Sequence, residues 1–427
     1  MSLVSAPRPS DADAARRQRG LAVAAVTRIV PKDGHWLVPS QSGAGSYRVR
    51  LESPSGPHCT CRDFETRGEP CKHIYAVRFA LDPAKRPDPP ESIPDAREVA
   101  RRTQAPRPTY KQDWPAYTAA QIGEKAKLQA LLRDLCRGVP EPPRRKGRPP
   151  VPMADRAFST AFKVYTTVSG RQAWTDIRDA GARGHLSRAP HYTSVSRFLD
   201  DPAMTPVFRS LIVESARPLA SVERDFAADS SGFTSCRFES WFDHKYGVVR
   251  RQHDWVKVHV MCGVTTNVVT AVEIGDRNAS DPVMLPALLA TTAERFAMRE
   301  VSADKVYASL DNYAEISRHG ATPFIPFKSI HTGAGGGLWA KMYHFYNYNR
   351  EEFHARYHKR SNVESTFSMM KAKFGDSLRS KSPTAMVNEA LCKILCHNIC
   401  CLIQSVYELR IEPTFWGREE AGPPPGL

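Results

Sequence analysis

The chain has 427 residues, enough for two to four domains and at least one large hydrophobic core. Sixty Lys and Arg residues against forty-five Asp and Glu residues give a net charge of +15, which favours a polyanionic partner, most often nucleic acid. Ten cysteines are too few for a disulfide scaffold, and the N-terminus lacks the apolar segment of a secretory signal peptide. These features exclude a small disulfide-stapled secreted protein and favour a cytoplasmic protein with reduced thiols.

Residues 20–82 predict a small β/α module. Short β-rich runs at 23–26, 36–38 and 47–51 are separated by the turn signals Asp33-Gly34 and Ser42-Gly43. This pattern predicts a small antiparallel sheet, followed by an apolar helical run that begins near residue 73.

Four residues between the sheet and this helix have the spacing Cys-x-Cys-x9-Cys-x-His, namely Cys59, Cys61, Cys71 and His73. Three thiolates and one imidazole satisfy a tetrahedral Zn²⁺, and because the protein fills all four positions the site is expected to be structural. The motif, with its Cys-Lys-His-Ile tail, resembles the SWIM zinc finger. That family is taken to bind either DNA or protein, and the sequence does not distinguish the two.

Residues 83–150 are rich in proline and arginine and predict a linker, interrupted by one helix at about 117–137. The stretch Lys146-Gly147-Arg148-Pro149 resembles an AT-hook core, an arm that lies in the minor groove of A·T-rich DNA. Because Lys146 replaces the usual arginine, a basic proline-rich linker is the competing interpretation.

Residues 151–220 show mainly helical patterns. Helices predicted at 173–180 and 193–198 flank a turn, which favours two interpretations. One is plain helical support for a core; the other is a helix-turn-helix whose DNA-facing residues are Tyr192, Ser194 and Arg197.

Two aspartates are predicted to end short strands in the following segment, residues 221–410. The apolar run 226–228 predicts a strand that ends at Asp229, with Ser230-Ser231-Gly232 turning away. Asp304 ends a later strand. Asp225 and Asp243 are the alternatives to Asp229 as the functional acid of this region, and Asp311 is the alternative to Asp304. Asp311, however, stands where a helix is expected to be capped.

Between these aspartates the pattern predicts a β-hairpin, with strands at 255–264 and 268–274, and then an apolar helix at about 280–296. A long apolar helix is predicted from about Pro383 to Tyr407. Because polar residues interrupt it, a buried helix is favoured over a membrane span. Its cysteines at every fourth position, Cys392, Cys396 and Cys400, favour a packed stripe over a second metal site. Residues 411–427 are predicted to be a disordered tail.

The stretch YHKRSNVESTFSMMKAKF, residues 357–374, is predicted to be one helix. At about 100° per residue, four polar residues then lie within roughly 60° of one another, beside an apolar stripe; they are Tyr357, Arg360, Glu364 and Lys371. Glu364 can ligate Mg²⁺, and the two cations can bind phosphate oxygens, while the tyrosine can position a phosphate or stack on a base. A surface helix with one Arg–Glu pair is the alternative.

The spacing Tyr-x2-Arg-x3-Glu-x6-Lys resembles the signature of one branch of the DDE transposases, insertion-sequence enzymes with an RNase H-like core. The resemblance implies an α/β fold, with a mixed sheet flanked by helices and a helical N-terminal region that binds transposon ends. It implies that Asp229, Asp304 and Glu364 hold two Mg²⁺ or Mn²⁺ ions. Tyr357, Arg360 and Lys371 would then contact DNA phosphates.

The same resemblance implies cleavage at transposon ends and joining to target DNA, by a homodimer at the nucleoid of a bacterial or archaeal cell. Two other functions remain open: a related nuclease without strand transfer, and a transposase-derived zinc-finger protein that only binds DNA. Only 60 residues separate Asp304 from Glu364, which leaves no room for the large β-rich insertion of some relatives.

Overall fold

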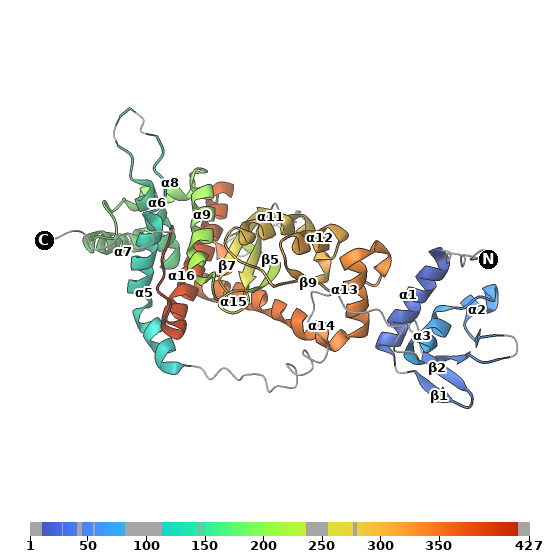
Figure 1. Ribbon diagram of the computed structural model, residues 1–427. Coiled ribbons are helices and arrows are strands. Elements are labelled where there is room, and N and C mark those ends of the chain that lie inside the picture. The colour runs from blue at the N-terminus through green and yellow to red at the C-terminus, as the bar shows by residue number, and fades with distance from the viewer. Residues whose placement is uncertain are drawn as a thin grey trace, which may run out of the picture. The chain divides into compact units, whose positions relative to one another are not determined.

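The computed structural model describes residues 11–27, 29–40, 45–53, 56–81, 113–143, 146–147, 149–235, 255–275 and 280–416. The chain divides into two compact units, whose elements are labelled in Figure 1. The first unit comprises residues 1–108, 308–314 and 322–358; the second comprises residues 109–307, 315–321 and 359–427. The predicted catalytic segment 221–410 therefore contributes to both units.

The first unit contains the predicted small antiparallel sheet. Its strands lie in chain order: β1 (Val30–Lys32), β2 (His35–Pro39), β3 (Ser46–Arg50) and β4 (His58–Cys59). Asp33 and Gly34, with φ angles of 46° and 71°, form the tight turn between β1 and β2. The strands predicted at 36–38 and 47–51 are thus confirmed, while the predicted turn at Ser42-Gly43 lies outside the described residues.

Two helices, α1 (Asp11–Val26) and α3 (Lys72–Leu81), pack with this sheet, and α2 (Arg62–Arg67) follows β4. The strand predicted at 23–26 is wrong, because these residues end α1. The preceding Ala- and Arg-rich run favours a helix, and Val23 reaches the core from the helical face. Gly20 permits close packing of α1 on α3, since a Cβ there would lie 2.4 Å from the Cβ of Tyr75.

The later part of the first unit holds β9 (Thr322–Phe324), α13 (Gly337–Tyr348) and α14 (Arg350–Tyr357). Aromatic side chains form its core. The Phe327 ring lies 4.8 Å from that of Trp339 and 5.2 Å from that of Tyr343, and Tyr313 lies 5.0 Å from Trp339.

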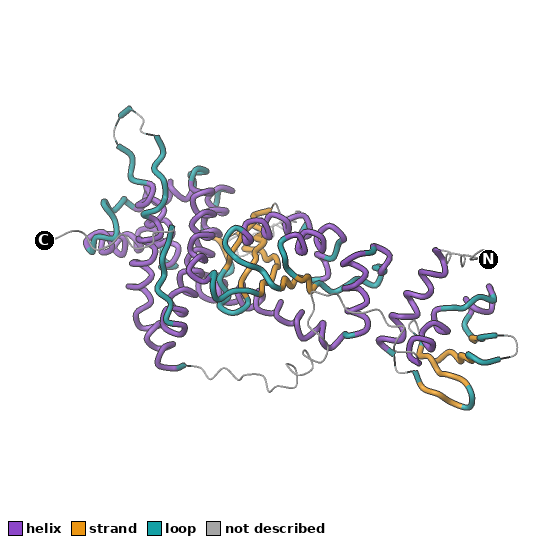
Figure 2. The backbone as a smooth tube through the Cα atoms, viewed as in Figure 1, coloured by secondary structure: helices purple, strands orange, loops and turns teal. Residues whose placement is uncertain are grey.

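A mixed sheet forms the centre of the second unit (Figure 2). Its strands β7 (Val269–Gly275), β6 (Trp255–Gly263) and β5 (Asp225–Ser235) are antiparallel neighbours. β8 (Glu300–Ala303) and β10 (Ser377–Leu378) both pair with β5 in parallel. The expected mixed sheet, the β6–β7 hairpin and the short strand before Asp304 are all confirmed.

The end predicted for the strand at 226–229 is wrong. β5 does not stop at Asp229 but continues to Ser235, paired with β6 from Phe226↔Gly263 to Thr234↔Trp255. Gly232 is therefore not a turn residue. A Cβ at this position would lie 2.1 Å from the Trp255 ring, so the glycine makes room for an aromatic side chain that covers the strand.

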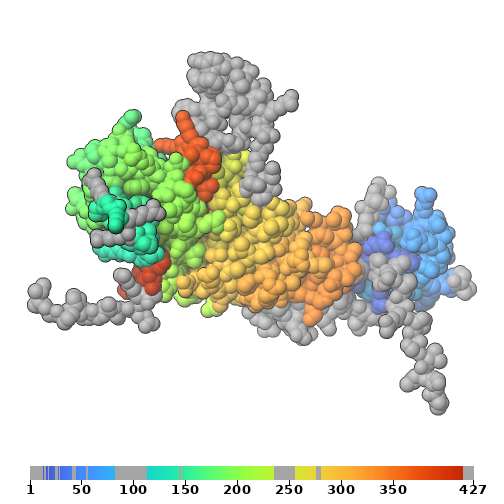
Figure 3. Space-filling view, turned by 90° about the horizontal axis from the view of Figure 1, so that it is seen from above, coloured from blue at the N-terminus to red at the C-terminus, as the bar shows by residue number. Residues whose placement is uncertain are grey.

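The helices that pack on this sheet are α9 (Met204–Ala216), α11 (Asp281–Ala293), α15 (Ser361–Phe374) and α16 (Pro383–Leu409). The earlier helices of the unit pack on one another and on α9 and α16; they are α5 (Trp114–Cys136), α6 (Met153–Tyr165), α7 (Gly170–Ala182) and α8 (Tyr192–Leu199). α12 (Leu310–Arg318) spans residues of both units. Figure 3 shows the green surface of α6 to α9 continuous with the yellow surface of the sheet region. The helices predicted at 117–137, 173–180, 193–198 and 280–296 all form.

The helix α16 packs against α5, α6 and α9. It is long and apolar enough to cross a membrane by length and composition, yet 83% of its most apolar window is buried inside the structure. The predicted buried helix is confirmed, and its Cys392 and Cys396 are fully buried. Since α5 packs on α16, residues 114–136 belong to the second unit rather than to a linker.

The C-terminal boundary also lies later than predicted. Phe415 is buried, and the Trp416 indole donates a 2.8 Å hydrogen bond to the Leu135 carbonyl oxygen. Residues 411–416 are therefore ordered on the second unit, and residues 417–427 lie outside the described part of the chain.

The stretch 357–374 is not one helix. α14 ends at Tyr357, a 3₁₀ turn spans His358–Arg360, and α15 begins at Ser361. A 3₁₀ turn advances about 120° per residue instead of about 100°, so its three residues add about 60° in total, and residues three apart such as Tyr357 and Arg360 stay on one side. Arg360, Glu364 and Lys371 remain on or beside α15, but Tyr357 belongs to a different helix and to the first unit.

The contacts of Lys393 explain why a lysine is found in the apolar helix α16. Its ammonium group is buried and donates hydrogen bonds to the carbonyl oxygens of Gly375 (2.9 Å) and Ser377 (2.8 Å). It also lies 5.2 Å from the centre of the Phe233 ring. The lysine therefore joins α16 to the chain that leaves α15 and to strand β5.

Burial lowers the pKa of Lys393 from 10.5 to about 8. Between these values the unfolded chain binds the extra proton, so the stability of the wild type should rise with pH relative to Lys393→Met, by up to about 3 kcal/mol. Chemical denaturation of both proteins between about pH 7.5 and 10.5 measures this difference. A difference that stays constant over the window would contradict the assignment.

Candidate active site and zinc centre

Two of the predicted acids lie at the same level on neighbouring strands. β5 and β8 pair in parallel with Ala228 opposite Ala303, and Asp229 and Asp304 each follow that pair by one residue. Neighbouring strands are separated by about 4.8 Å, so the sheet places these two carboxylates side by side. β8 ends at Ala303, which leaves Asp304 at the carboxyl end of the parallel pair, half-buried.

The environment of Asp229 shows that the charges of the three predicted acids interact. Burial raises the pKa of Asp229, and the negative charges of Asp304 and Glu364 raise it further. The Ser230 backbone N–H, which donates to Asp229 Oδ1 at 2.8 Å, and the Arg360 guanidinium oppose this rise. The net shift is upward, so the folded protein disfavours the ionised form of Asp229.

Arg360 lies between two of the acids. Its Nη1 donates to Asp229 Oδ2 at 3.0 Å, and its Nη2 forms an ion pair with Glu364 Oε1. The guanidinium is 19% exposed at its side chain, whereas the Glu364 side chain is 56% exposed. One arginine thus joins the strand acid to the helix acid.

The helix α15 lies along one face of β5. Residues 229, 231 and 233 point to the same face of the strand because side chains alternate. Arg360 contacts the first of them, and Lys371 Nζ donates to Ser231 Oγ at 2.7 Å and lies 5.7 Å from the centre of the Phe233 ring. Among the described residues, Lys371 forms no ion pair with a carboxylate, so its charge is available to an anionic ligand.

An ion-pair network that the sequence did not predict anchors this arrangement. Lys359 Nζ lies 2.6 Å from Asp225 Oδ2 and 2.7 Å from Glu300 Oε2, at the starts of β5 and β8. Arg299 adds a second cation to Asp225. Although burial raises the pKa of Asp225, the hydrogen bonds from both cations hold it below its ordinary value. Asp225, a rival for the first acid, is thus neutralised by its neighbours.

The opposite face of β5 carries a second polar cluster without a sequence signal. Ser230 Oγ donates to Asp281 Oδ1 at 3.0 Å, and Lys257 Nζ lies 2.6 Å from the same oxygen. The buried His259 ring lies 3.4 Å from it. Only strand pairing brings β5, β6 and the start of α11 together here.

Further predicted residues remain to be placed. Tyr357 ends α14, three residues before Arg360, and its contact with phosphate stays a prediction. Asp311 lies in the first turn of α12, as expected for a helix-capping region. Asp243 and Arg148 of the AT-hook-like stretch lie outside the described residues.

The predicted helix-turn-helix residues lie on α8. Arg197 is exposed. The Tyr192 ring lies 6.4 Å from the Trp174 ring of α7, and the Arg171 guanidinium lies 5.7 Å from the centre of the Tyr192 ring. The loop between α7 and α8 runs from 183 to 191, which is long for a helix-turn-helix. The surface is nevertheless basic and aromatic.

The four predicted zinc ligands converge in the first unit. Cys59, Cys61, Cys71 and His73 are buried, and their ligand atoms all lie within 4.8 Å of one another. The His73 Nδ1 atom lies 3.7 Å from the sulfur of Cys59 and 3.9 Å from that of Cys71. A tetrahedral zinc with Zn–S near 2.3 Å and Zn–N near 2.0 Å requires a separation of about 3.6 Å.

One thiolate is favoured at this centre before any metal binds. A hydrogen bond from Cys59 and one with His73 lower the pKa of Cys71, whereas the hydrogen bond to Cys71 raises that of Cys59 and burial raises that of Cys61. A thiolate is the form that binds zinc. The Tyr47 ring stacks on His73 at 4.3 Å and fixes the plane of the imidazole.

Comparison with known families assigns the acids and the Cys₃His centre to two different domains. Residues 220–399 match the model of the transposase DDE domain. Residues 47–81 match the model of the SWIM zinc finger. No curated protein matches the sequence. The chain thus contains a transposase DDE domain, which spans the acids of β5, β8 and α15, and a SWIM finger, which spans the Cys₃His centre.

The two metal sites differ in how closely their donors approach. Within the described ranges, only the Cys₃His group brings three or more candidate ligand atoms within 4.8 Å of one another. The carboxylates of the DDE domain are less closely drawn together, with a guanidinium between two of them. Their hard oxygen donors fit a divalent cation such as the DDE domain implies.

The raised pKa of Asp229 gives a test of this electrostatic crowding. Asp229→Asn should stabilise the metal-free protein at neutral pH, because the folded environment disfavours the carboxylate. A carboxyl with a raised folded-state pKa loses stability as the pH rises above its ordinary value of 3.8, so the advantage of the variant should grow over that window and vanish below it. Denaturant unfolding between about pH 3 and 7 measures it. A less stable variant at neutral pH would contradict the inference.

Zinc removal should act on the finger alone. The full chain is expected to bind one zinc ion at this centre, and Cys71→Ser should lower the zinc content and the melting temperature of the finger. Cys400→Ser, a half-buried cysteine of α16, is the matched control and should keep both values. Zinc analysis and calorimetry measure the outcome; equal zinc loss in both variants would refute the assignment.

Proposed function

We propose that this protein is a DNA transposase of the Tyr-Arg-Glu-Lys group with an RNase H-like core. In this proposal Asp229, Asp304 and Glu364 are the catalytic acids that hold two Mg²⁺ or Mn²⁺ ions. The observation that carries the proposal is the parallel register of β5 and β8, with Asp229 and Asp304 each one residue beyond the paired Ala228 and Ala303 and Glu364 joined to Asp229 through Arg360.

The chain's own groups can divide the work on a phosphodiester. Two ions bound at the carboxylates would activate the attacking water or 3′-hydroxyl and stabilise the departing oxygen. Arg360 can exchange a carboxylate for a phosphate oxygen, since it forks between two anions in this arrangement. Lys371, without a carboxylate partner in the described part of the chain, adds a second phosphate contact from the same helix.

Strand cleavage at transposon ends followed by transfer to target DNA is the reaction we infer from this arrangement. Tyr357, three residues before Arg360, is proposed as a further phosphate contact. We further propose that two copies of the chain pair the transposon ends, and that the protein works at the nucleoid in the cytoplasm.

Substitution of the three acids tests the catalytic assignment. Asp229→Ala, Asp304→Ala and Glu364→Ala should each reduce Mg²⁺-dependent cleavage of a duplex cut from the DNA on either side of the gene, where transposon ends are expected, by at least about a hundredfold. DNA binding should persist. Asp311→Ala is the matched control, because this exposed acid is the rival of Asp304 in sequence and should leave cleavage intact. Loss of cleavage in the Asp311 variant with activity retained by Asp304→Ala would overturn the assignment.

Strand transfer separates the alternatives. A transposase joins pre-cleaved ends to a target plasmid, whereas a related nuclease of this fold cuts without joining. A protein that has kept only DNA binding would bind the duplex but would neither cut nor join it when a metal ion is added.

A further inference from the structure

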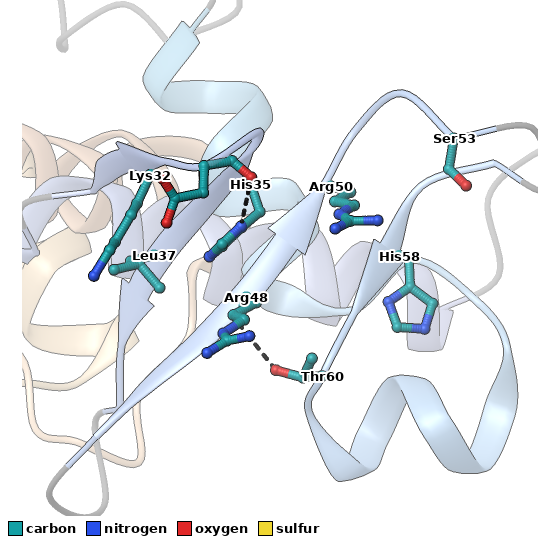
Figure 4. Close-up of a pocket in the computed structure, with 9 residues that line it drawn as sticks. Lys32, His35, Leu37, Arg48, Arg50, Ser53, His58 and Thr60 are labelled. Atoms are coloured by element: carbon teal, nitrogen blue, oxygen red, sulfur yellow. Dashed lines mark hydrogen bonds between the residues drawn. The ribbon is translucent and has the colours of Figure 1, made fainter.

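The four-stranded sheet of the SWIM finger has one open face, which forms a hollow of about 690 Å³ (Figure 4). It is lined by residues of all four strands and their ends: Lys32, Asp33, His35, Leu37, Arg48, Arg50, Ser53, His58 and Thr60. The zinc centre lies behind this sheet, since Cys59 belongs to the buried core on the other face.

Strand alternation separates the two faces cleanly. Trp36, Val38, Tyr47 and Val49 turn inward to the core that α1 and α3 cover. The intervening residues therefore turn outward; apart from Leu37, its partner Val30 and Pro39 they are polar or charged. The outer face is not a core surface that lacks its partner, because most of its side chains are polar or charged.

The outward residues carry a row of free positive charge. Lys32, Arg48 and Arg50 are exposed, and none of them forms an ion pair with any described residue. Asp33 is the one acid of the lining, and its carbonyl oxygen lies 3.1 Å from His35 Nδ1. Figure 4 shows Arg48 and Arg50 side by side on β3, with Lys32 across the sheet.

The spacing of these cations suits a polyanion. Residues two apart on a strand lie about 7 Å apart, and each DNA strand presents one phosphate for about every 3.4 Å of helix axis. The backbone N–H of Arg48 is satisfied by Thr60 Oγ1 at 2.9 Å, which ties β3 to the end of β4 and leaves the guanidinium to bind outward.

We propose that this face binds the phosphodiester backbone of duplex DNA through Lys32, Arg48 and Arg50. The choice of DNA rests on the proposed function, since the same chain carries a transposase DDE domain. An acidic protein partner fits less well, because protein interfaces depend on buried aromatic or aliphatic anchors, and the hollow is lined by one apolar side chain, Leu37, and by no aromatic ring other than histidine. Contacts of this kind carry little sequence preference.

The test uses the full zinc-loaded chain and a labelled duplex of arbitrary sequence, followed by fluorescence anisotropy over a range of salt. The triple variant K32Q/R48Q/R50Q should bind at least about tenfold more weakly near 0.1 M salt. Its plot of log affinity against log salt should be shallower by about 2 to 3. Zinc content must match the wild type, which shows that the finger is folded.

A second triple variant, R62Q/R67Q/R78Q, is the matched control. These three exposed arginines lie on α2 and α3 of the same unit, outside the lining, and their loss lowers the net charge by the same amount. Affinity and salt slope should stay near the wild-type values. Equal losses in both triple variants, or none in the first, would overturn the proposal, as would tighter binding of polyglutamate than of the duplex.

The outcome is separable from that of the proposed function. Metal-dependent cleavage without the predicted change in salt slope would refute this inference alone. The predicted change in a chain that never cleaves DNA would refute the transposase activity and leave the binding face standing.

Discussion

The pairing of β5 with β8 is the constraint on which the candidate site depends. A parallel ladder with Ala228 opposite Ala303 leaves no freedom in where the next residues lie, so Asp229 and Asp304 become neighbours although 75 residues separate them in sequence. A shift of the register by one residue would turn one of these side chains to the other face. The network of Lys359 with Asp225 and Glu300 stabilises that register at the start of both strands.

This arrangement brings negatively charged side chains together at a partly buried place in the protein. The pKa of Asp229 rises because burial and two neighbouring carboxylates disfavour its ionised form. Arg360 offsets part of this cost by bridging Asp229 and Glu364. A carboxyl group with a raised pKa beside a cationic helix face is expected in a site that binds divalent ions and phosphates. When such ligands bind, their charges can take the place of the ion pairs that Arg360 forms with the acids.

The zinc finger is stabilised in a different way from the second unit. A short four-stranded sheet with two helices buries a small core, and the convergence of three cysteines and His73 at its edge offers the additional stabilisation that a zinc ion provides. Holding one face of the sheet in this way leaves the other face polar and exposed. The second unit needs no such centre, because α16 runs through its core and contacts α5, α6 and α9.

The sequence by itself determined the features that depend on local spacing. The Cys-x-Cys-x9-Cys-x-His motif, the β6–β7 hairpin, the helices of the second unit and the position of Asp304 after a short strand all follow from neighbouring residues. Tertiary structure decided what local patterns leave open. Residues 23–26 joined a helix because Val23 packs into the finger core, and β5 ran past Gly232 because the Trp255 ring covers it and β6 supplies the hydrogen bonds. The 3₁₀ turn at His358–Arg360 divided the predicted helix in two. Only tertiary structure could bring Lys359, Asp225 and Glu300 together, because no local pattern encodes a contact across so many residues.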